Sequence, residues 1–155
     1  MLTDEERKEI NEAITHYEYK RAACIDAMKI LQRHRSGWIS DESIEDLADF
    51  LGMTKHEIEN VATYYSMIYR KPVGRHIILV CDGFSCWALG YDNIIAHLIS
   101  RLGIGLSETT PDGRFTLLHM PCIGACDHSP AMIIDEDLHG DLDNAKIDEI
   151  LKEYR

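Results

Sequence analysis

The sequence has no long hydrophobic run. None of its stretches approaches the roughly 20 consecutive apolar residues that a helix needs to cross a membrane. The first twelve residues are dominated by Asp, Glu, Lys and Arg, and so lack the apolar segment of a secretory signal. We therefore expect a cytoplasmic protein that reaches a membrane only through partners. With 155 residues, of which 45% are apolar, the chain can bury a core without help from a metal.

The sequence also lacks the basic surface that would attract nucleic acid. It has 16 Lys and Arg against 27 Asp and Glu, a formal net charge of -11, and no basic stripe interleaved with aromatic residues. Because a negatively charged protein repels a phosphate backbone, we expect no nucleic-acid ligand. The acidic residues crowd between Asp135 and Glu153, where a solvated surface is a sufficient explanation.

The first half of the chain has a helical pattern. From residue 4 to residue 70, apolar residues recur at spacings of three and four. Ser40 and Gly52 stand where the cap and the stop of one helix belong, and Thr54 and Glu57 form a capping-box pair for the next. We predict four short amphipathic helices, marked in turn by Ile10, Ile14 and Tyr17; by Ile25, Met28 and Leu31, with an end near Gly37; by Ile44, Leu47, Ala48 and Leu51; and by Ile58, Val61 and Ala62.

Pro72 and Gly74 break this pattern, and the second half of the chain is mixed. Its order, β-α-β-β-α, suggests a small open sheet with helices packed on it, of thioredoxin-like type. Asp112-Gly113 supplies a turn before the second strand. We predict an α+β protein with an N-terminal helical bundle over residues 1–70 and a thioredoxin-like α/β domain over residues 71–155, the latter with strands at 76–81, 115–118 and 131–134 and helices at 93–102 and 145–154.

Four of the five cysteines form two close pairs in this second domain. Cys81 and Cys86 have four residues between them, and Cys122 and Cys126 have three. On the predicted topology Cys81 ends the first strand, Cys86 lies in the loop that enters the following helix, and the second pair lies in the loop between the second and third strands. Two loops at the same sheet edge can present four sulfurs to one metal centre. An odd cysteine count and a reducing compartment both argue against a disulfide framework.

The spacing of the pairs bears on which group they hold. Structural zinc usually uses C-x2-C knuckles, and a redox dithiol of the thioredoxin kind needs C-x2-C after the first strand; neither pair has that spacing. Plant-type ferredoxins use C-x4-C-x2-C with a distant fourth cysteine, which matches only the first pair. A [2Fe-2S] cluster fits the spacing best, because each iron can take one pair while the two irons share bridging sulfides. Zinc stays open as an alternative.

Other residues near the pairs are assigned simpler roles. Gly83 and Gly124 lie inside the two pairs, where a tight backbone can offer N–H groups to sulfur. His128 follows the last cysteine by two residues, which is like one half of a Rieske site, but no second such pair exists, so we interpret it as a loop residue. His119 is interpreted as a strand-end residue, and Cys24 as an inert thiol buried in a helix.

These residues together are recognisable. Over nearly its whole length the chain resembles the E-subunit family of bacterial NADH-quinone oxidoreductase, the small [2Fe-2S] subunits of the peripheral arm of respiratory complex I. Tyr64 and Ile123 depart mildly from the family pattern, which has Phe and Leu there. The resemblance rests on Gly37-Trp38-Ile39, Val61-Ala62-Thr63-Tyr64-Tyr65, Pro72-Val73-Gly74-Arg75-His76, Cys81 to Cys86, Asp112-Gly113-Arg114-Phe115-Thr116-Leu117-Leu118, and Cys122-Ile123-Gly124-Ala125-Cys126-Asp127 with Pro130.

The resemblance implies a role in electron transfer. It carries the four ligands of one [2Fe-2S] cluster onto Cys81, Cys86, Cys122 and Cys126. It also implies as partners a flavoprotein subunit that binds FMN and NADH and the other iron-sulfur subunits of the arm, at the inner membrane but without insertion. Gly103-Ile104-Gly105 lacks the third glycine of a dinucleotide fingerprint, which agrees with NADH and FMN sites in the partner. The chain alone should have no turnover.

Two alternatives and one docking hypothesis accompany this interpretation. Related small subunits occur in NAD-linked hydrogenases and formate dehydrogenases and share the cysteine pattern, and a zinc-stabilised assembly module without redox activity would need the same thiols. We hypothesise that the bundle, including Trp38, grips the flavoprotein. Two groups of basic residues could also dock a neighbour, although ordinary surface charge is the simpler interpretation. One group is Lys29, Arg33 and Arg35, and the other is Arg70, Lys71 and Arg75.

Overall fold

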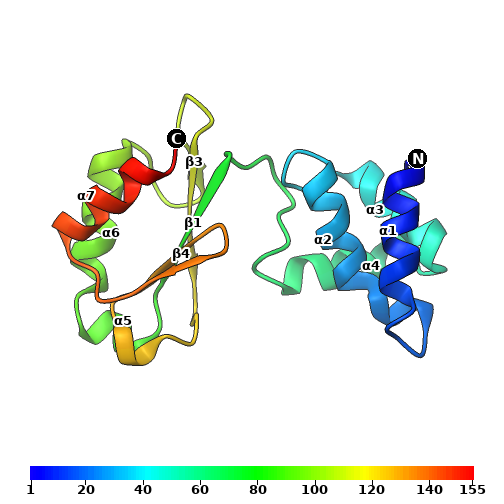
Figure 1. The fold of residues 1–155 in the computed structure, drawn as a ribbon, viewed down its shortest axis with the longest axis horizontal. Helices are drawn as coiled ribbons and strands as arrows, with labels where there is room; N and C mark the ends of the chain where they lie inside the picture. The colour runs from blue at the N-terminus through cyan, green and yellow to red at the C-terminus, as the bar shows by residue number, and fades with distance from the viewer. The chain divides into compact units, whose positions relative to one another are not determined.

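The computed structural model describes residues 1–155 and divides them into two compact units, Met1–Pro72 and Val73–Arg155. The first unit is built of helices, and the second contains all five strands (Figure 1). The sequence places the domain boundary between residues 70 and 71, and the division in the structure follows Pro72. No helix in either unit is long and apolar enough to cross a membrane.

Four α-helices form the first unit, as predicted. They are α1 (Asp4–Ile14), α2 (Cys24–His34), α3 (Asp41–Leu51) and α4 (Lys55–Tyr64), with one short 3-10 segment, η1 (Lys20–Ala23), before α2. Each α-helix turns an apolar face inward, because its apolar residues recur at helical spacing. The fully buried side chains at the centre of this core include Ile10, Met28, Leu31, Ile39, Leu47 and Ile58.

The helix ends follow from local sequence. The Ser40 hydroxyl accepts a hydrogen bond from the backbone N–H of Ser43, and Gly52 ends α3 in the left-handed conformation at φ 67°. Thr54 and Glu57 form the predicted capping box of α4. The first helix is shorter than predicted. It ends at Ile14, and Tyr17 lies beyond it with its hydroxyl donating to a carboxylate oxygen of Asp26 at 2.6 Å.

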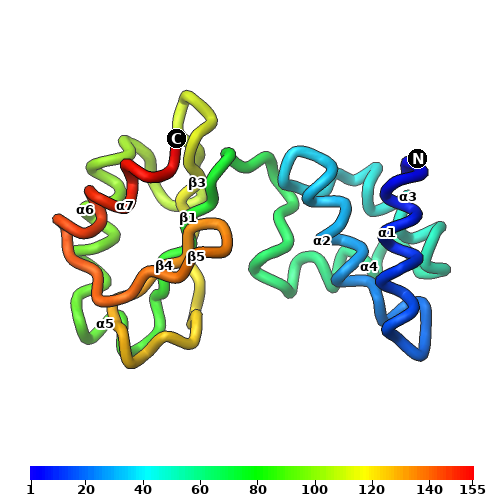
Figure 2. The backbone as a smooth tube through the Cα atoms, viewed as in Figure 1, coloured from blue at the N-terminus to red at the C-terminus, as the bar shows by residue number.

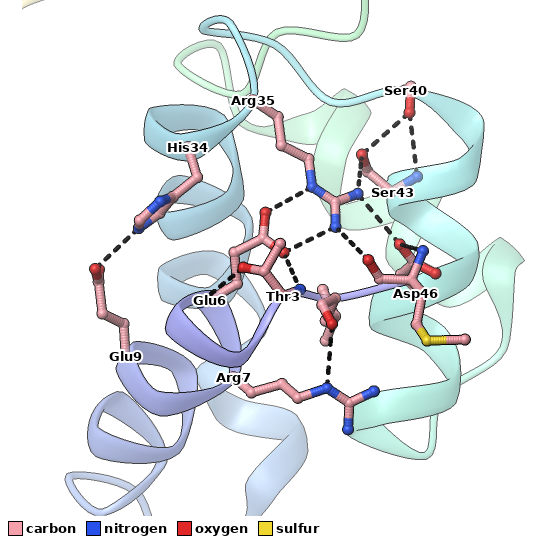
Figure 3. Close-up of polar contacts among 11 residues, drawn as sticks. Thr3, Glu6, Arg7, Glu9, His34, Arg35, Ser40, Ser43 and Asp46 are labelled. Carbon is pink, nitrogen blue, oxygen red and sulfur yellow. Dashed lines mark hydrogen bonds and ion pairs between the residues drawn. The ribbon is translucent and has the colours of Figure 1, made fainter.

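A buried ion pair ties α1, α2 and α3 together (Figure 3). The Arg35 guanidinium donates to both carboxylate oxygens of Glu6, at 2.7 and 2.9 Å, and to Asp46 at 3.2 Å. Only 2% of Glu6 is exposed, and Arg35 lowers the pKa of its carboxyl to about 2. Arg70 is tied down in the same way, to Glu59, Asp41 and the Ile39 carbonyl. The donors of Arg35 and Arg70 are therefore used inside the unit, and docking of a neighbour by the two basic groups stays a prediction.

The second unit is a five-stranded sheet of order β2-β3-β1-β4-β5. The central strand β1 (His76–Cys81) runs parallel to β3 (Phe115–Met120) and antiparallel to β4 (Met132–Ile134). Figure 2 shows β4 continuing into β5 (Asp137–His139) as an orange hairpin, which matches the antiparallel pairing of these strands. The remaining elements are α5 (Phe84–Ala88), α6 (Tyr91–Leu102), β2 (Glu108–Thr109), η2 (Cys126–His128) and α7 (Asn144–Glu153).

The two long helices of this unit, α6 and α7, lie on one side of the sheet (Figure 1). Their apolar faces pack on the sheet through a core that includes Ile78 and Val80 of β1, Leu98 of α6 and Ile147 of α7. All three predicted strands and both predicted helices are present. The prediction missed α5, β2 and β5, which have five residues or fewer and are too short to show a period.

Candidate metal centre

The sheet brings both cysteine pairs to the end at which the parallel strands β1 and β3 finish. Cys81 is the last residue of β1 and lies opposite Met120, the last residue of the parallel neighbour β3. On the side of β3, the backbone N–H of Asp82 donates to the carbonyl of Met120 at 3.0 Å. On the side of β4, the N–H of Cys81 donates to the carbonyl of Ala131 at 3.1 Å. The end of β1 is therefore fixed between the two ends of the segment that carries Cys122 and Cys126.

The two members of the first pair are buried and those of the second pair are exposed. Cys81 and Cys86 are 3% and 2% exposed. The prediction that Cys86 lies in a loop is wrong, because it is the third residue of the short helix α5. Cys122 lies in the β3–β4 loop, and Cys126 begins η2 in the same loop. One pair thus faces the interior of the unit, and the other faces solvent.

Gly83 lets the first loop pass close to the second. A Cβ atom at this position would lie 2.7 Å from the backbone carbonyl oxygen of Pro121, 3.4 Å from the Cys81 sulfur and 3.7 Å from the Cys122 Cβ. The need for glycine here comes from close approach, since the φ of Gly83 is an ordinary -61°. Gly124 has a different reason, a left-handed backbone at φ 84°. Both glycines allow the loops to fold tightly around the thiols.

Backbone donors face the first pair. Burial raises the pKa of the Cys81 thiol, while hydrogen bonds from the backbone N–H groups of Gly83 and Ile123 lower it, one from each loop. These two donors oppose the cost of placing negative charge on a buried sulfur. The Cys86 thiol raises the same pKa through its own contact with Cys81, so the two sulfurs of the pair lie together.

The second pair is also coupled. The Cys122 thiol raises the pKa of Cys126 through a hydrogen bond and through charge. The structure gathers no group of three or more His, Cys, Asp or Glu side chains suited to one metal ion. Two thiol pairs on adjacent loops nevertheless match a binuclear cluster, because each iron takes two thiolates and the sulfides complete its coordination. The donor set, the tight glycine approach and the backbone N–H groups fit a [2Fe-2S] cluster.

The two histidines near the cysteine pairs have carboxylate partners, and the fifth cysteine is buried in the other unit. His119 Nδ1 lies 2.8 Å from an oxygen of Asp82, and His128 Nδ1 lies 2.9 Å from an oxygen of Asp141, which raises the His128 pKa. Each histidine is thus engaged by a carboxylate. Cys24 is in the bundle core at 4% exposure, where burial raises its pKa to about 11.

α5 and the residue after it carry exposed apolar side chains, which the sequence patterns did not predict. Phe84 is 80% exposed and Trp87 is 59% exposed, with their ring centroids 6.1 Å apart, and Leu89 just after the helix is 61% exposed. They flank Cys86, so the surface beside the candidate cluster site is apolar. The aromatic residues on both sides of a cysteine were the signal that could have revealed it.

Comparison with known proteins agrees with this geometry. Residues 10–155 match the model of the thioredoxin-like [2Fe-2S] ferredoxin family. The chain is 46% identical over 154 residues to the E subunit of NADH-quinone oxidoreductase from Pseudomonas aeruginosa, covering 99% of this chain and 92% of that protein. It is 47% identical over 154 residues to the protein of the same name from Escherichia coli K12, with the same coverage.

Solved structures of a larger enzyme share the fold. An NAD+-reducing [NiFe]-hydrogenase in its H2-reduced state aligns with 85% of this chain at a TM-score of 0.71 and 23% identity. The same enzyme in its air-oxidized state aligns at a TM-score of 0.68. This chain spans 22% of the length of the hydrogenase chain. At this identity the likeness concerns the fold alone.

Proposed function

The chain belongs to the thioredoxin-like [2Fe-2S] ferredoxin family, and we propose that it is the electron-transfer subunit of an NADH-quinone oxidoreductase, holding one [2Fe-2S] cluster in the peripheral arm. The observation that carries this proposal is that two loops, each with two cysteines, meet where β1 and β3 end. The chain is also similar to the oxidoreductase E subunits over nearly its whole length. The chain contributes to the oxidoreductase as one of its subunits and has no turnover alone.

Four thiolates of this chain are assigned as the cluster ligands. Cys81 and Cys86 would hold the cluster from the buried side, and Cys122 and Cys126 would hold it from the exposed side. When bound, the cluster supplies reversible one-electron transfer. The N–H groups of Gly83 and Ile123 stabilise the negative charge on the Cys81 sulfur, and the burial of the first pair excludes water from it.

The partner of this subunit is a flavoprotein that binds NADH and FMN. Electron transfer requires the cluster to lie close to the flavin, so the partner must cover the surface beside the four cysteines. Phe84, Trp87 and Leu89 give that surface exposed apolar area, which suits burial by another protein. The other iron-sulfur subunits of the arm complete the set of partners, and through them the chain is held at the cytoplasmic side of the inner membrane.

The same fold serves in an NAD+-reducing hydrogenase, which makes that enzyme class the second candidate. Identity separates the two, because the chain is 46% identical to the oxidoreductase subunit and 23% identical to the hydrogenase chain. The oxidoreductase is therefore the function that the observations favour.

The proposal is tested by measuring whether NADH reduces the cluster directly or only through the flavoprotein. The cluster-loaded chain is mixed with NADH anaerobically, with and without the NADH-binding flavoprotein subunit of the same source, and the EPR signal of the reduced cluster is recorded. We expect dithionite to reduce the cluster in both samples and NADH to reduce it only when the flavoprotein is present. A chain that NADH reduces unaided, or that stays oxidised with a competent flavoprotein, would contradict the proposal. The Cys122→Ser variant is the control without an intact cluster.

A further inference from the structure

The hydroxyl group of Ser129 bridges the two cysteine pairs. Ser129 follows η2 in the loop of the second pair, and its hydroxyl oxygen accepts a hydrogen bond from the Cys86 thiol of the first pair at 3.4 Å. The same hydroxyl donates to the backbone carbonyl of Cys126 at 3.0 Å. The Ser129 hydroxyl thus contacts the sulfur of Cys86 and the backbone carbonyl of Cys126, and both cysteines are proposed ligands.

The hydrogen bond must reverse when the thiol becomes a ligand. An iron-bound thiolate has no proton, so the Cys86 sulfur can then only accept. The Ser129 hydroxyl carries one proton, and the Cys126 carbonyl and the Cys86 sulfur compete for it. A charged acceptor attracts a donor more strongly than a neutral carbonyl does, and a hydroxyl proton turns without movement of heavy atoms. The Ser129 hydroxyl, which accepts from the Cys86 thiol, therefore donates its proton to the Cys86 sulfur once that sulfur is a thiolate ligand.

We propose that the Ser129 hydroxyl donates a hydrogen bond to the Cys86 sulfur and thereby raises the reduction potential of the cluster. This inference rests on the proposed function, because it needs a cluster on the four cysteines. Reduction adds one electron to a centre with four thiolates, so its formal charge goes from -2 to -3. A hydrogen bond to sulfur is stronger in the more negative state, and this selective stabilisation makes the cluster easier to reduce.

A second hydroxyl connects the loops in the opposite direction. Ser85, on α5 beside Cys86, forms a hydrogen bond with the thiol of Cys126. Each loop therefore places a serine against a cysteine of the other loop. The cross-loop contacts indicate that the hydroxyls belong to the environment of the sulfurs, and are not merely surface groups of their own loops.

The test is an EPR-monitored redox titration of the full, cluster-loaded chain as wild type, Ser129→Ala and Ser129→Thr. We expect Ser129→Ala to lower the midpoint potential, so that at a fixed solution potential the ratio of reduced to oxidised cluster falls about tenfold, which is about 59 mV for a one-electron couple. Ser129→Thr keeps the hydroxyl and should stay close to wild type. Ser100→Ala, an exposed serine of α6, is the matched control and should leave the potential unchanged.

The outcomes separate this inference from the function it rests on. If the wild type binds no [2Fe-2S] cluster after reconstitution, the proposed function fails. If the wild type and Ser129→Ala carry equal iron and sulfide and have the same potential, the inference about Ser129 is overturned. Ser129→Gly provides a second variant without the hydroxyl. If both the Ala and the Gly variants lose the cluster, Ser129 is required for assembly and the inference about potential is wrong.

Discussion

Cys24 of the helical bundle and Cys81 of the sheet unit are both buried, at 4% and 3% exposure, yet their surroundings differ. Cys24 is packed among apolar side chains of the bundle core, and burial raises its pKa to about 11. Cys81 has a second thiol beside it and backbone N–H donors from Gly83 and Ile123. Burial alone makes a cysteine inert, whereas a second thiol and directed N–H donors make it suited to bind a metal.

The two units also differ in which groups stabilise a buried negative charge. The bundle buries a complete ion pair, in which Arg35 neutralises Glu6 inside the same unit. In the sheet unit, backbone N–H groups of Gly83 and Ile123 favour the charged form of the Cys81 sulfur, and no cationic side chain does so. The bundle therefore neutralises its buried charge with its own residues, whereas the cysteine loops present thiols suited to a cofactor.

The largest effect is expected from the ligands. Cys122→Ser should abolish or strongly perturb the cluster, because a hard hydroxyl oxygen is a poor substitute for a thiolate. Cys24→Ser should leave the visible and EPR spectra of the cluster unchanged, because its thiol lies in the other unit's core. Iron and sulfide analysis of both variants checks this. An intact cluster in the Cys122 variant would remove that residue from the ligand set.

The next largest effect is expected in the bundle. Glu6→Gln should lower the free energy of unfolding by about 3 kcal/mol at pH 7, because it leaves the partly buried Arg35 without its main counter-charge. Urea unfolding followed by circular dichroism at 222 nm measures the change. Glu5→Gln, an exposed neighbour on α1, is the control and should change little. Equal stability of the two variants would show that the buried pair contributes nothing.

The same pair should make the bundle sensitive to acid. The pKa of Glu6 is about 2 in the folded chain against a usual 4.5, so the unfolded chain takes up the proton first as pH falls. Its stabilisation is therefore complete above about pH 4.5 and is lost as the pH falls from 4.5 toward 2. The loss is about 3 kcal/mol, from 1.36 kcal/mol per pKa unit. Urea unfolding at several pH values should show a shallower acid slope in Glu6→Gln than in wild type.

A smaller effect is expected where the loops approach each other. Gly83→Ala would place a Cβ 2.7 Å from the Pro121 carbonyl, so one loop must shift. We expect a loss of about 1–3 kcal/mol in the stability of the sheet unit and weaker retention of the cluster. Gly105→Ala is the matched control, because its added Cβ meets only the flexible side chain of Glu108, at 3.3 Å and beyond. Thermal melts and iron content compare the two, and identical results would exclude a steric role for Gly83.

Sequence patterns predicted the long elements well and the short ones poorly. The four bundle helices, the Ser40 and Thr54 caps and the central strand at 76–81 are present in the structure, because each has a periodic core face or a local capping signal. The helix around Cys86 was missed, since one turn of helix shows no period. At the ligand loops, the two-plus-two spacing indicated the chemistry, and the assignment of the four ligands stays a prediction.

Contacts between residues far apart in the chain were beyond the sequence patterns. Arg35 and Arg70 looked like free surface charges because their acidic partners stand up to 29 positions away. The Cys86–Ser129 contact spans 43 positions and depends on the folded sheet. Local spacing predicts which residues could bind a cluster, whereas the contacts around their sulfur atoms come from the tertiary fold.

The most direct test of the account is a low-temperature EPR spectrum of the anaerobically purified, dithionite-reduced chain, with iron, sulfide and zinc measured on the same sample. We expect an S = 1/2 signal with two irons and two sulfides per chain, in a reddish-brown protein. One zinc per chain, no iron and no EPR signal, persisting after reconstitution with iron and sulfide, would contradict it and favour a zinc-stabilised module.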